Sequence, residues 1–340
     1  MTPGGAISAS VAENLLASIG RVGGNPDEIR AKIGMQRSTT QSGAASLSLA
    51  EFTSILECGA SEFCDSTFGF ELAKVFPHEG LGPVAQLLMA TLTIGDGVSC
   101  FARNLPALQT STKFSLSVHG DLARIDYKID DPTVRRRAQD ANFSLGILHS
   151  ILARLLGQRF RIVSVELEQI VRGAATAYQK YFSCPIRFGQ ATNAICFPAN
   201  FLELPNPFAD ICIKKRLERE LANQFARADF IASVRAWMTA GFALSAPVDI
   251  ECAAADFGMS PRSFQRKLST MEVSYLDLRN EVRSQIARCM LADTSMPITT
   301  VALHLGYSEA SAFSRYFRLQ TGLSPAEFRA RSWDAPADPA

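Results

Sequence analysis

Two stretches near the end of the chain share one pattern and decide the fold of this region. The first reads GMSPRSFQRKL over residues 258–268, and the second reads GYSEASAFSRYFR over residues 306–318. In each, a glycine turn follows one helical pattern and precedes another. We expect Ser260 and Ser308 to cap the second helix of each pair. The duplication predicts two helix-turn-helix units in an all-α region.

The second helix of each unit has an apolar face and a polar face. Phe264 and Leu268 lie four residues apart, as do Phe313 and Phe317, so each pair forms a stripe that faces a core. Arginine, glutamine and serine side chains reach base edges and phosphates in DNA complexes. On the polar faces these residues are Arg262, Gln265 and Arg266 in the first helix and Ser311, Arg315 and Arg318 in the second.

Residues 274–291 form a continuous helical pattern between the two units. At about 1.5 Å per residue this helix is roughly 27 Å long, and successive major grooves on one face of DNA lie about 34 Å apart. A rigid helix of this length would hold two recognition helices about one turn of DNA apart. The local charge agrees, because residues 260–333 hold ten Arg or Lys against six Asp or Glu.

These stretches, with residues 298–305 and the sequence TGLSPAEFR at 321–329, resemble the AraC/XylS family of bacterial transcription regulators over residues 229–332. The resemblance implies that both second helices face DNA bases. Ala310 would offer only an apolar contact, for example to a thymine methyl group. The expected base-reading residues are Arg262, Gln265, Arg266, Ala310, Ser311 and Arg315. The residues expected to hold phosphates are Ser260, Lys267, Ser308 and Arg318.

The first recognition helix departs from the family pattern at its end. Where the family has a glycine, this chain reads MEV at 271–273, whereas Gly322 keeps the expected place in the second unit. Valine resists the left-handed backbone of a common helix C-cap, so we expect the first helix to end differently. The sequence SPAE at 324–327 predicts a capping box at the start of the last helix.

The first 200 residues mix helical patterns with strands of period two. Residues 114–118 and 123–127 alternate around a His-Gly-Asp turn and predict a β-hairpin, and a second hairpin is expected between 185–188 and 194–197. The predicted fold is an α+β sensor domain of helices and antiparallel hairpins. An all-α DNA-binding domain follows, with two helix-turn-helix motifs joined by a linker helix.

This first region resembles the effector-binding domain of the arabinose-binding-like branch of the same family, through residues 68–87, 95–105 and 181–194. The ligand is left open among amines, amino acids, aromatic acids and lipids. Ligand pockets are mostly apolar with a few polar anchors, so aromatic residues are candidates, although ordinary core packing is the favoured explanation for them. The candidate pocket residues are Phe68, Phe70, Phe101, Phe114, Tyr127 and Tyr178.

The sequence LPNP at 204–207 is the clearest break in the middle of the chain, and a charged helical pattern follows it. We therefore expect four segments. They are an effector-binding domain at 1–206, a helical connector at 207–228, the DNA-binding domain at 229–333 and a disordered tail at 334–340.

The composition excludes several classes of protein. The chain has 340 residues, and 34 Lys or Arg against 33 Asp or Glu give a net charge of +1. The eight cysteines form no C-x-x-C pair, and the four histidines share no catalytic spacing with a nucleophile, so we expect no metal, no cofactor and no catalytic residue. No signal peptide or apolar span is present, which predicts a cytoplasmic protein with reduced thiols and no membrane partner.

The sequence thus predicts a ligand-responsive, sequence-specific transcription regulator rather than an enzyme. Its expected partners are double-stranded promoter DNA, a small-molecule effector, RNA polymerase and a second copy in a homodimer. Family habit favours an activator. The alternatives are a repressor of the same family, an enzyme domain tethered to DNA, or a module that binds proteins through the same helices.

Overall fold

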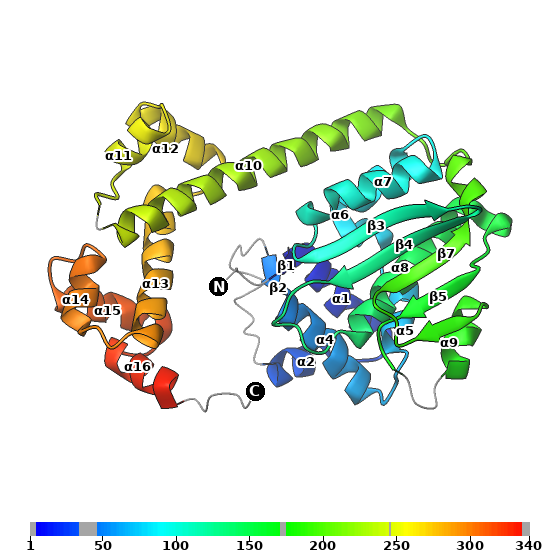
Figure 1. The fold of residues 1–340 in the computed structure, drawn as a ribbon, viewed down its shortest axis with the longest axis horizontal. Helices are drawn as coiled ribbons and strands as arrows, with labels where there is room; N and C mark the ends of the chain where they lie inside the picture. Colours follow the sequence, from blue (N-terminus) through cyan, green and yellow to red (C-terminus); the bar gives the residue numbers. More distant parts are fainter. Residues whose placement is uncertain (1–4, 34–45, 171–174, 245, 335–340) are drawn as a thin grey trace. The chain divides into compact units, whose positions relative to one another are not determined.

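The computed structural model divides the chain into two compact units, which we describe separately (Figure 1). The N-terminal unit is Met1–Gln224 and the C-terminal unit is Phe225–Ala340, so the division falls within helix α10 (Ile211–Ala243). The residues that the structure describes are 5–33, 46–170, 175–244 and 246–334.

The N-terminal unit is built from amphipathic helices around a sheet. In α1, for example, Val11, Leu15 and Ile19 recur at helical spacing and are fully buried. The helices are α1 (Ala9–Arg21), α2 (Pro26–Lys32), α4 (Leu49–Glu62), α5 (Phe68–Val75), α6 (Gly82–Ala90), α7 (Ile94–Asn104), α8 (Ala138–Leu156) and α9 (Ala175–Phe182). Short 3₁₀ helices lie at His78–Leu81, Leu105–Ala107, Gly157–Arg159 and Ala199–Glu203.

The main sheet has five strands in the order β3-β4-β7-β5-β6. The first predicted hairpin is confirmed, because β3 and β4 pair antiparallel with His119 opposite Leu122 and Phe114 opposite Tyr127. A separate small sheet pairs β1 (Ala6–Ser8) with β2 (Ser46–Ser48), which are too short for an alternating pattern to reveal. The main strands are β3 (Thr112–His119), β4 (Leu122–Ile129), β5 (Ser164–Leu167), β6 (Ile186–Phe188) and β7 (Asn193–Pro198).

The second predicted hairpin, between 185–188 and 194–197, is wrong. Strand β7 pairs antiparallel with β4 on one side and with β5 on the other, while β6 pairs with β5 in parallel. Because β7 is buried along nearly its whole length, its backbone groups need hydrogen-bond partners at both edges. Strand β5 therefore lies between β7 and β6, and the two segments expected to form a hairpin are not neighbours.

A chain of buried hydrogen bonds joins the sheet to α8, which packs against β4 and β7. Gln109 Nε2 donates to the Tyr127 hydroxyl at 3.1 Å, and this hydroxyl donates to Asp140 Oδ2 at 2.7 Å. The other oxygen, Asp140 Oδ1, is buried and accepts no hydrogen bond from the described residues. Burial raises the pKa of Asp140 to about 7; the charge of Glu57 adds to the rise, and the Tyr127 hydrogen bond opposes it.

The C-terminal unit has two apolar cores that share helix α13. Leu278 and Val282 belong to the first core, Ala287 and Leu291 belong to the second, and Ile286 packs against both. The predicted pair of helix-turn-helix units joined by one helix is therefore confirmed. The helices are α11 (Ile250–Asp256), α12 (Pro261–Thr270), α13 (Tyr275–Asp293), α14 (Ile298–His304), α15 (Ala310–Thr321) and α16 (Pro325–Asp334).

The predicted N-cap of α15 is wrong, and the predicted capping box of α16 is confirmed. Helix α15 begins at Ala310, and its N-cap residue is Glu309, so Ser308 lies one position too early to cap it. The capping box of α16 is confirmed, since Ser324 Oγ accepts from Glu327 N at 3.2 Å and Glu327 Oε2 accepts from Ser324 N at 2.7 Å. Of the expected tail, residues 335–340 lie outside the described residues, and Asp334 ends α16.

Helix α12 ends in a Schellman motif, in which the left-handed residue is a glutamate instead of the usual glycine. Glu272 has a φ of 56°, which places it in the left-handed region, and Gly322 has a φ of 74° at the corresponding place after α15. Glu272 N donates to Ser269 O at 2.9 Å and Val273 N donates to Leu268 O at 3.1 Å, the pair of bonds that defines a Schellman motif. The first helix thus ends normally, and a strained backbone replaces the missing glycine.

We expect Glu272→Gly to raise the free energy of unfolding of the full chain by about 0.5–1 kcal/mol. A left-handed residue with a Cβ costs about 1–2 kcal/mol, and the added freedom of glycine in the unfolded chain offsets part of that gain. The side chain is 88% exposed and lies 3.8 Å from Arg227, so its ion pair contributes little. Urea unfolding measures the change. The matched control is Gly322→Ala, whose Cβ would meet nothing within 4 Å, so that it should lose about 1 kcal/mol through the backbone alone.

Asp140→Asn should remove a pH dependence of stability between pH 5 and pH 7. Because the folded pKa of Asp140 is above its unfolded value, the folded chain binds the extra proton in this range. Stability of the native sequence therefore falls as pH rises, by up to about 1.4 kcal/mol per pH unit from this group, and levels off above pH 7. In urea unfolding at several pH values, the free energy of unfolding of the asparagine variant should rise relative to that of the native sequence as pH rises.

Asp131→Asn is the matched control, because the pKa of Asp131 is lowered by hydrogen bonds from Thr133 and from the backbone of Gly5. Its stabilising effect is fully present above about pH 4, so this variant should lose the same amount of stability at pH 5 and at pH 8. An Asp140→Asn difference that stays constant over this range would contradict the assignment.

Candidate DNA interface and effector cavity

Helix α12 presents three predicted base-reading side chains to solvent. Phe264 and Leu268 are buried against the first core at 0% and 1% exposure, which fixes the orientation of the helix. Arg262, Gln265 and Arg266 are exposed on the other faces. Within the described part of the chain, no hydrogen bond or ion pair engages these three side chains. The alternative interpretation, that the arginines are salt-bridged inside their own domain, is therefore not observed.

Helix α15 presents a similar surface with smaller side chains. Phe313 and Phe317 are buried in the second core, and Arg315 is exposed without an ion pair among the described residues. Ser311 is exposed, and its hydroxyl donates to Glu309 Oε2 at 2.9 Å. Ala310 is half-buried and packs against the second core. The two helices thus differ, since the expected base-reading residues are three long donors on α12 but one arginine, one serine and one alanine on α15.

The predicted phosphate contacts are less uniform. The Ser260 hydroxyl caps α12 by accepting from Ser263 N at 3.2 Å, so it is engaged within the protein. Lys267 is half-buried, and its Nζ lies 3.8 Å from the ring centroid of Phe230, a cation–π contact. Ser308 and Arg318 are exposed. Arg318 is therefore the most accessible cation of this group.

Arg283, which the sequence did not single out, lies between the two helix-turn-helix units. Its guanidinium carbon lies 5.5 Å from the ring centroid of Phe242 in α10 and 4.5 Å from that of Tyr307 in the turn before α15. Its Nε is buried and makes no hydrogen bond to the described residues. An arginine at this spacing normally predicts a solvated helix face, so only the structure reveals that it holds the second turn against α13.

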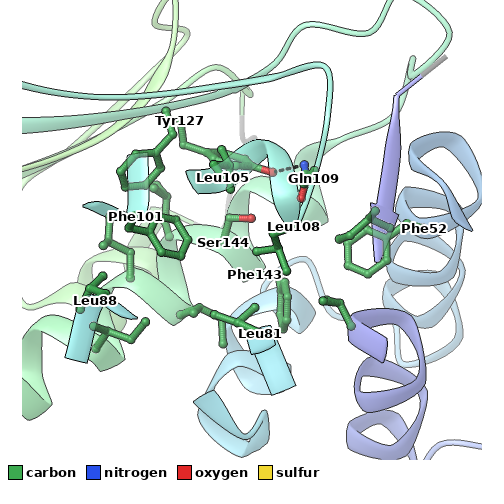
Figure 2. A pocket seen from close by; sticks show the side chains of 17 residues that line it. Phe52, Leu81, Leu88, Phe101, Leu105, Leu108, Gln109, Tyr127, Phe143 and Ser144 are labelled. Carbon is green, nitrogen blue, oxygen red and sulfur yellow. Dashed lines mark hydrogen bonds between the residues drawn. The ribbon is translucent and has the colours of Figure 1, made fainter. Parts of the chain in front are cut away.

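A cavity of about 60 Å³ lies in the core of the N-terminal unit (Figure 2). Its walls come from helices and strands that are distant in sequence, including Ile7 in β1, Phe52 in α4, Leu88 in α6 and Ile147 in α8. Most of the lining is aliphatic or aromatic. The polar residues on the wall are Gln109, Tyr127 and Ser144.

The structure brings three of the six candidate pocket aromatics together at this cavity. Phe101 and Phe114 pack with their ring centroids 5.1 Å apart, and Tyr127 lies beside them on the wall. Tyr178 is instead buried elsewhere in the core, where its hydroxyl donates to Ser66 O at 2.9 Å. Phe68 and Phe70, which do not line the cavity, pack in the aromatic core of α5.

Within residues 5–33, 46–170, 175–244 and 246–334, no helix is long and apolar enough to cross a bilayer. No group of three or more His, Cys, Asp or Glu side chains in the same residues is arranged to hold a metal ion.

Comparisons with known proteins place both units in one family. Residues 23–206 match the arabinose-binding domain of AraC transcription regulators, and residues 253–331 match a helix-turn-helix domain. The chain is 30% identical over 295 residues to the transcriptional regulator VirS of Mycobacterium tuberculosis, which covers 84% of this chain and 85% of VirS.

Two other similarities span most of the chain. An ornithine utilization regulator of Pseudomonas aeruginosa is 23% identical, over 83% of this chain and 84% of its own. The crystal structure of the transcriptional regulator CdpR of Pseudomonas aeruginosa is 20% identical, covers 89% of this chain and 96% of its own, and has a TM-score of 0.42. With two helix-turn-helix units on a shared linker helix and matches to both domains, the chain belongs to the AraC family of DNA-binding transcription regulators, not to a family of enzymes.

Proposed function

We propose that this chain is a ligand-responsive regulator in which α12 and α15 read bases in two successive major grooves. The observation that carries the proposal is the exposure of Arg262, Arg266 and Arg315 on helices whose opposite faces are fixed by two cores sharing α13. Helix α13 has 19 residues and is about 28 Å long, which is compatible with the roughly 34 Å between such grooves.

The proposed base contacts follow the chemistry of each side chain. Arg262, Arg266 and Arg315 would donate to guanine, and Gln265 would pair with adenine. Ser311 and Ala310 would make short polar and methyl contacts. Ser260, Lys267, Ser308 and Arg318 would lie at phosphates, and Arg318 is favoured among them because it is exposed.

The regulatory part of the proposal is that a small molecule bound by the N-terminal unit changes DNA binding. It is supported by the cavity and by the matched domain, which is named for arabinose binding. The name of the Pseudomonas relative also connects it to the use of a small metabolite. A ligand acts in this way only if it binds one state of the protein more tightly than the other. Activation through RNA polymerase, and action as a homodimer, follow from family resemblance.

Arg315→Ala and Arg318→Ala should separate base reading from phosphate binding on one helix. On DNA selected from a random pool by the full chain, Arg315→Ala should cost about 1–3 kcal/mol and relax the preference at one base pair. Arg318→Ala should weaken all sequences about equally and lower the salt slope by about one. Gel retardation at several salt concentrations measures both.

Leu319→Ala provides the control, because Leu319 is 81% exposed on the same helix and carries no charge. It should change neither affinity nor salt slope. Two results would contradict the role assignment: equal loss of sequence preference in both arginine variants, or DNA binding without salt dependence. The second result would favour a module that binds proteins.

A further inference from the structure

We propose that the cavity of the N-terminal unit binds an uncharged, mainly apolar small molecule that carries one hydrogen-bond donor, and that this donor meets the side-chain oxygen of Gln109. This inference deepens the proposed function. Only the effect of the ligand on DNA binding rests on that function. The binding claim itself rests on the chemistry of the cavity wall (Figure 2).

The wall contains no group that could neutralise a charged ligand. Of the 17 residues that line the cavity, the polar ones are Gln109, Tyr127 and Ser144, and none is Asp, Glu, Lys, Arg or His. Burial of an ammonium or carboxylate without a partner is strongly unfavourable. Tyr127 supplies no charge either, because burial raises its pKa well above the usual range. A free amino acid or a carboxylic acid therefore does not fit this wall.

Most hydrogen-bonding groups on the wall already bond to other side chains of the protein. The Tyr127 hydroxyl donates its only proton to Asp140 at 2.7 Å and accepts from Gln109 at 3.1 Å. The Gln109 amide also donates to Thr112 Oγ1 at 2.7 Å, so both of its N–H bonds are occupied. Its carbonyl oxygen accepts no hydrogen bond from the described residues. The Ser144 hydroxyl interacts with that of Tyr127. The group that best complements the free Gln109 oxygen is therefore a single hydroxyl or N–H donor.

This arrangement also argues against a sugar in this cavity. A monosaccharide has several hydroxyl groups, and each buried hydroxyl without a partner is costly. One free carbonyl oxygen and the Ser144 hydroxyl are too few to satisfy them. The name of the matched domain thus does not identify the ligand of this chain.

The size of the cavity implies that its walls move when a ligand enters. Its volume is about 60 Å³, whereas an engineered apolar cavity that holds benzene is about 150 Å³. A ligand of ring size must therefore displace side chains. Because β1, α4, α6, β3 and α8 all contribute to the wall, this displacement is shared by several elements rather than confined to one loop.

Four compounds of matched shape test the ligand class on the full chain: benzyl alcohol, toluene, benzoate and benzylammonium. Benzyl alcohol at ten times its dissociation constant should raise the melting temperature by about 3 °C or more, because it binds only the folded form. Toluene should bind more weakly, and the two ions should give no shift at the same concentrations. A larger shift with either ion would overturn the proposed class.

Variants locate the site. Gln109→Met keeps the volume but removes the acceptor, so it should weaken benzyl alcohol roughly two- to tenfold and leave toluene unchanged. Leu148→Phe should fill the cavity and abolish both shifts, whereas Leu152→Phe, a buried leucine of α8 outside the cavity wall, should retain them. Retention of the benzyl alcohol shift in both Gln109→Met and Leu148→Phe would overturn the proposal, and the Gln109 comparison decides it if a phenylalanine variant fails to fold.

Gel retardation with each probe separates this inference from the proposed function. Binding of benzyl alcohol at the cavity without any change in DNA affinity would support the ligand class and contradict ligand-responsive regulation. A change in DNA affinity caused by an ion, with no effect of the neutral compounds, would support regulation and overturn the ligand class.

Discussion

The packing of α13 into two cores is the constraint on which the exposed surfaces of α12 and α15 depend. Each helix-turn-helix unit has few buried apolar residues of its own, and α13 supplies part of both cores, with Ile286 contacting each. Burial of such side chains stabilises by about 1.5–3 kcal/mol each, so α13 contributes to the stability of both units. Arg283 adds a second connection, because its guanidinium contacts the rings of Phe242 and Tyr307. The separation of α12 and α15 therefore follows from packing.

Local patterns in the sequence predicted the C-terminal unit well because each helix there has its own signals. Apolar spacing, glycine turns and a capping box all point to the same elements. In the N-terminal unit the strands at 186–188 and 193–198 were located, but their pairing was not. Period-two alternation identifies a strand without identifying its neighbours, and here β5 separates the two. Pairing depends on which strands must satisfy buried backbone groups, and this is a property of the whole sheet.

The exposed residues of the candidate DNA interface could be predicted from local sequence spacing, whereas the residues of the cavity wall could not. Helical spacing alone separates the exposed arginines of α12 and α15 from the buried phenylalanines. The cavity wall combines residues from Ile7 to Ile151, and no spacing rule groups them, so only three of six candidate aromatics lie there. Glu272 illustrates a further limit. The missing glycine suggested a different helix end, yet the Schellman bonds form, since surrounding contacts can hold one residue in a strained conformation.

Under the proposed function, a cavity smaller than a ring-sized ligand would give a physical basis for a response in this family member. Without a ligand, contact among the apolar walls would favour the form with the smaller cavity, because each void leaves side chains without partners. A ring-sized molecule would bind only the form in which the walls have separated, and it would therefore shift the population toward that form. A shift from 1:99 to 99:1 requires about a 10⁴-fold preference for one form. Since the walls belong to both the sheet and the helices around it, the two forms would differ across the N-terminal unit, and even a small ligand would change more than its immediate surroundings.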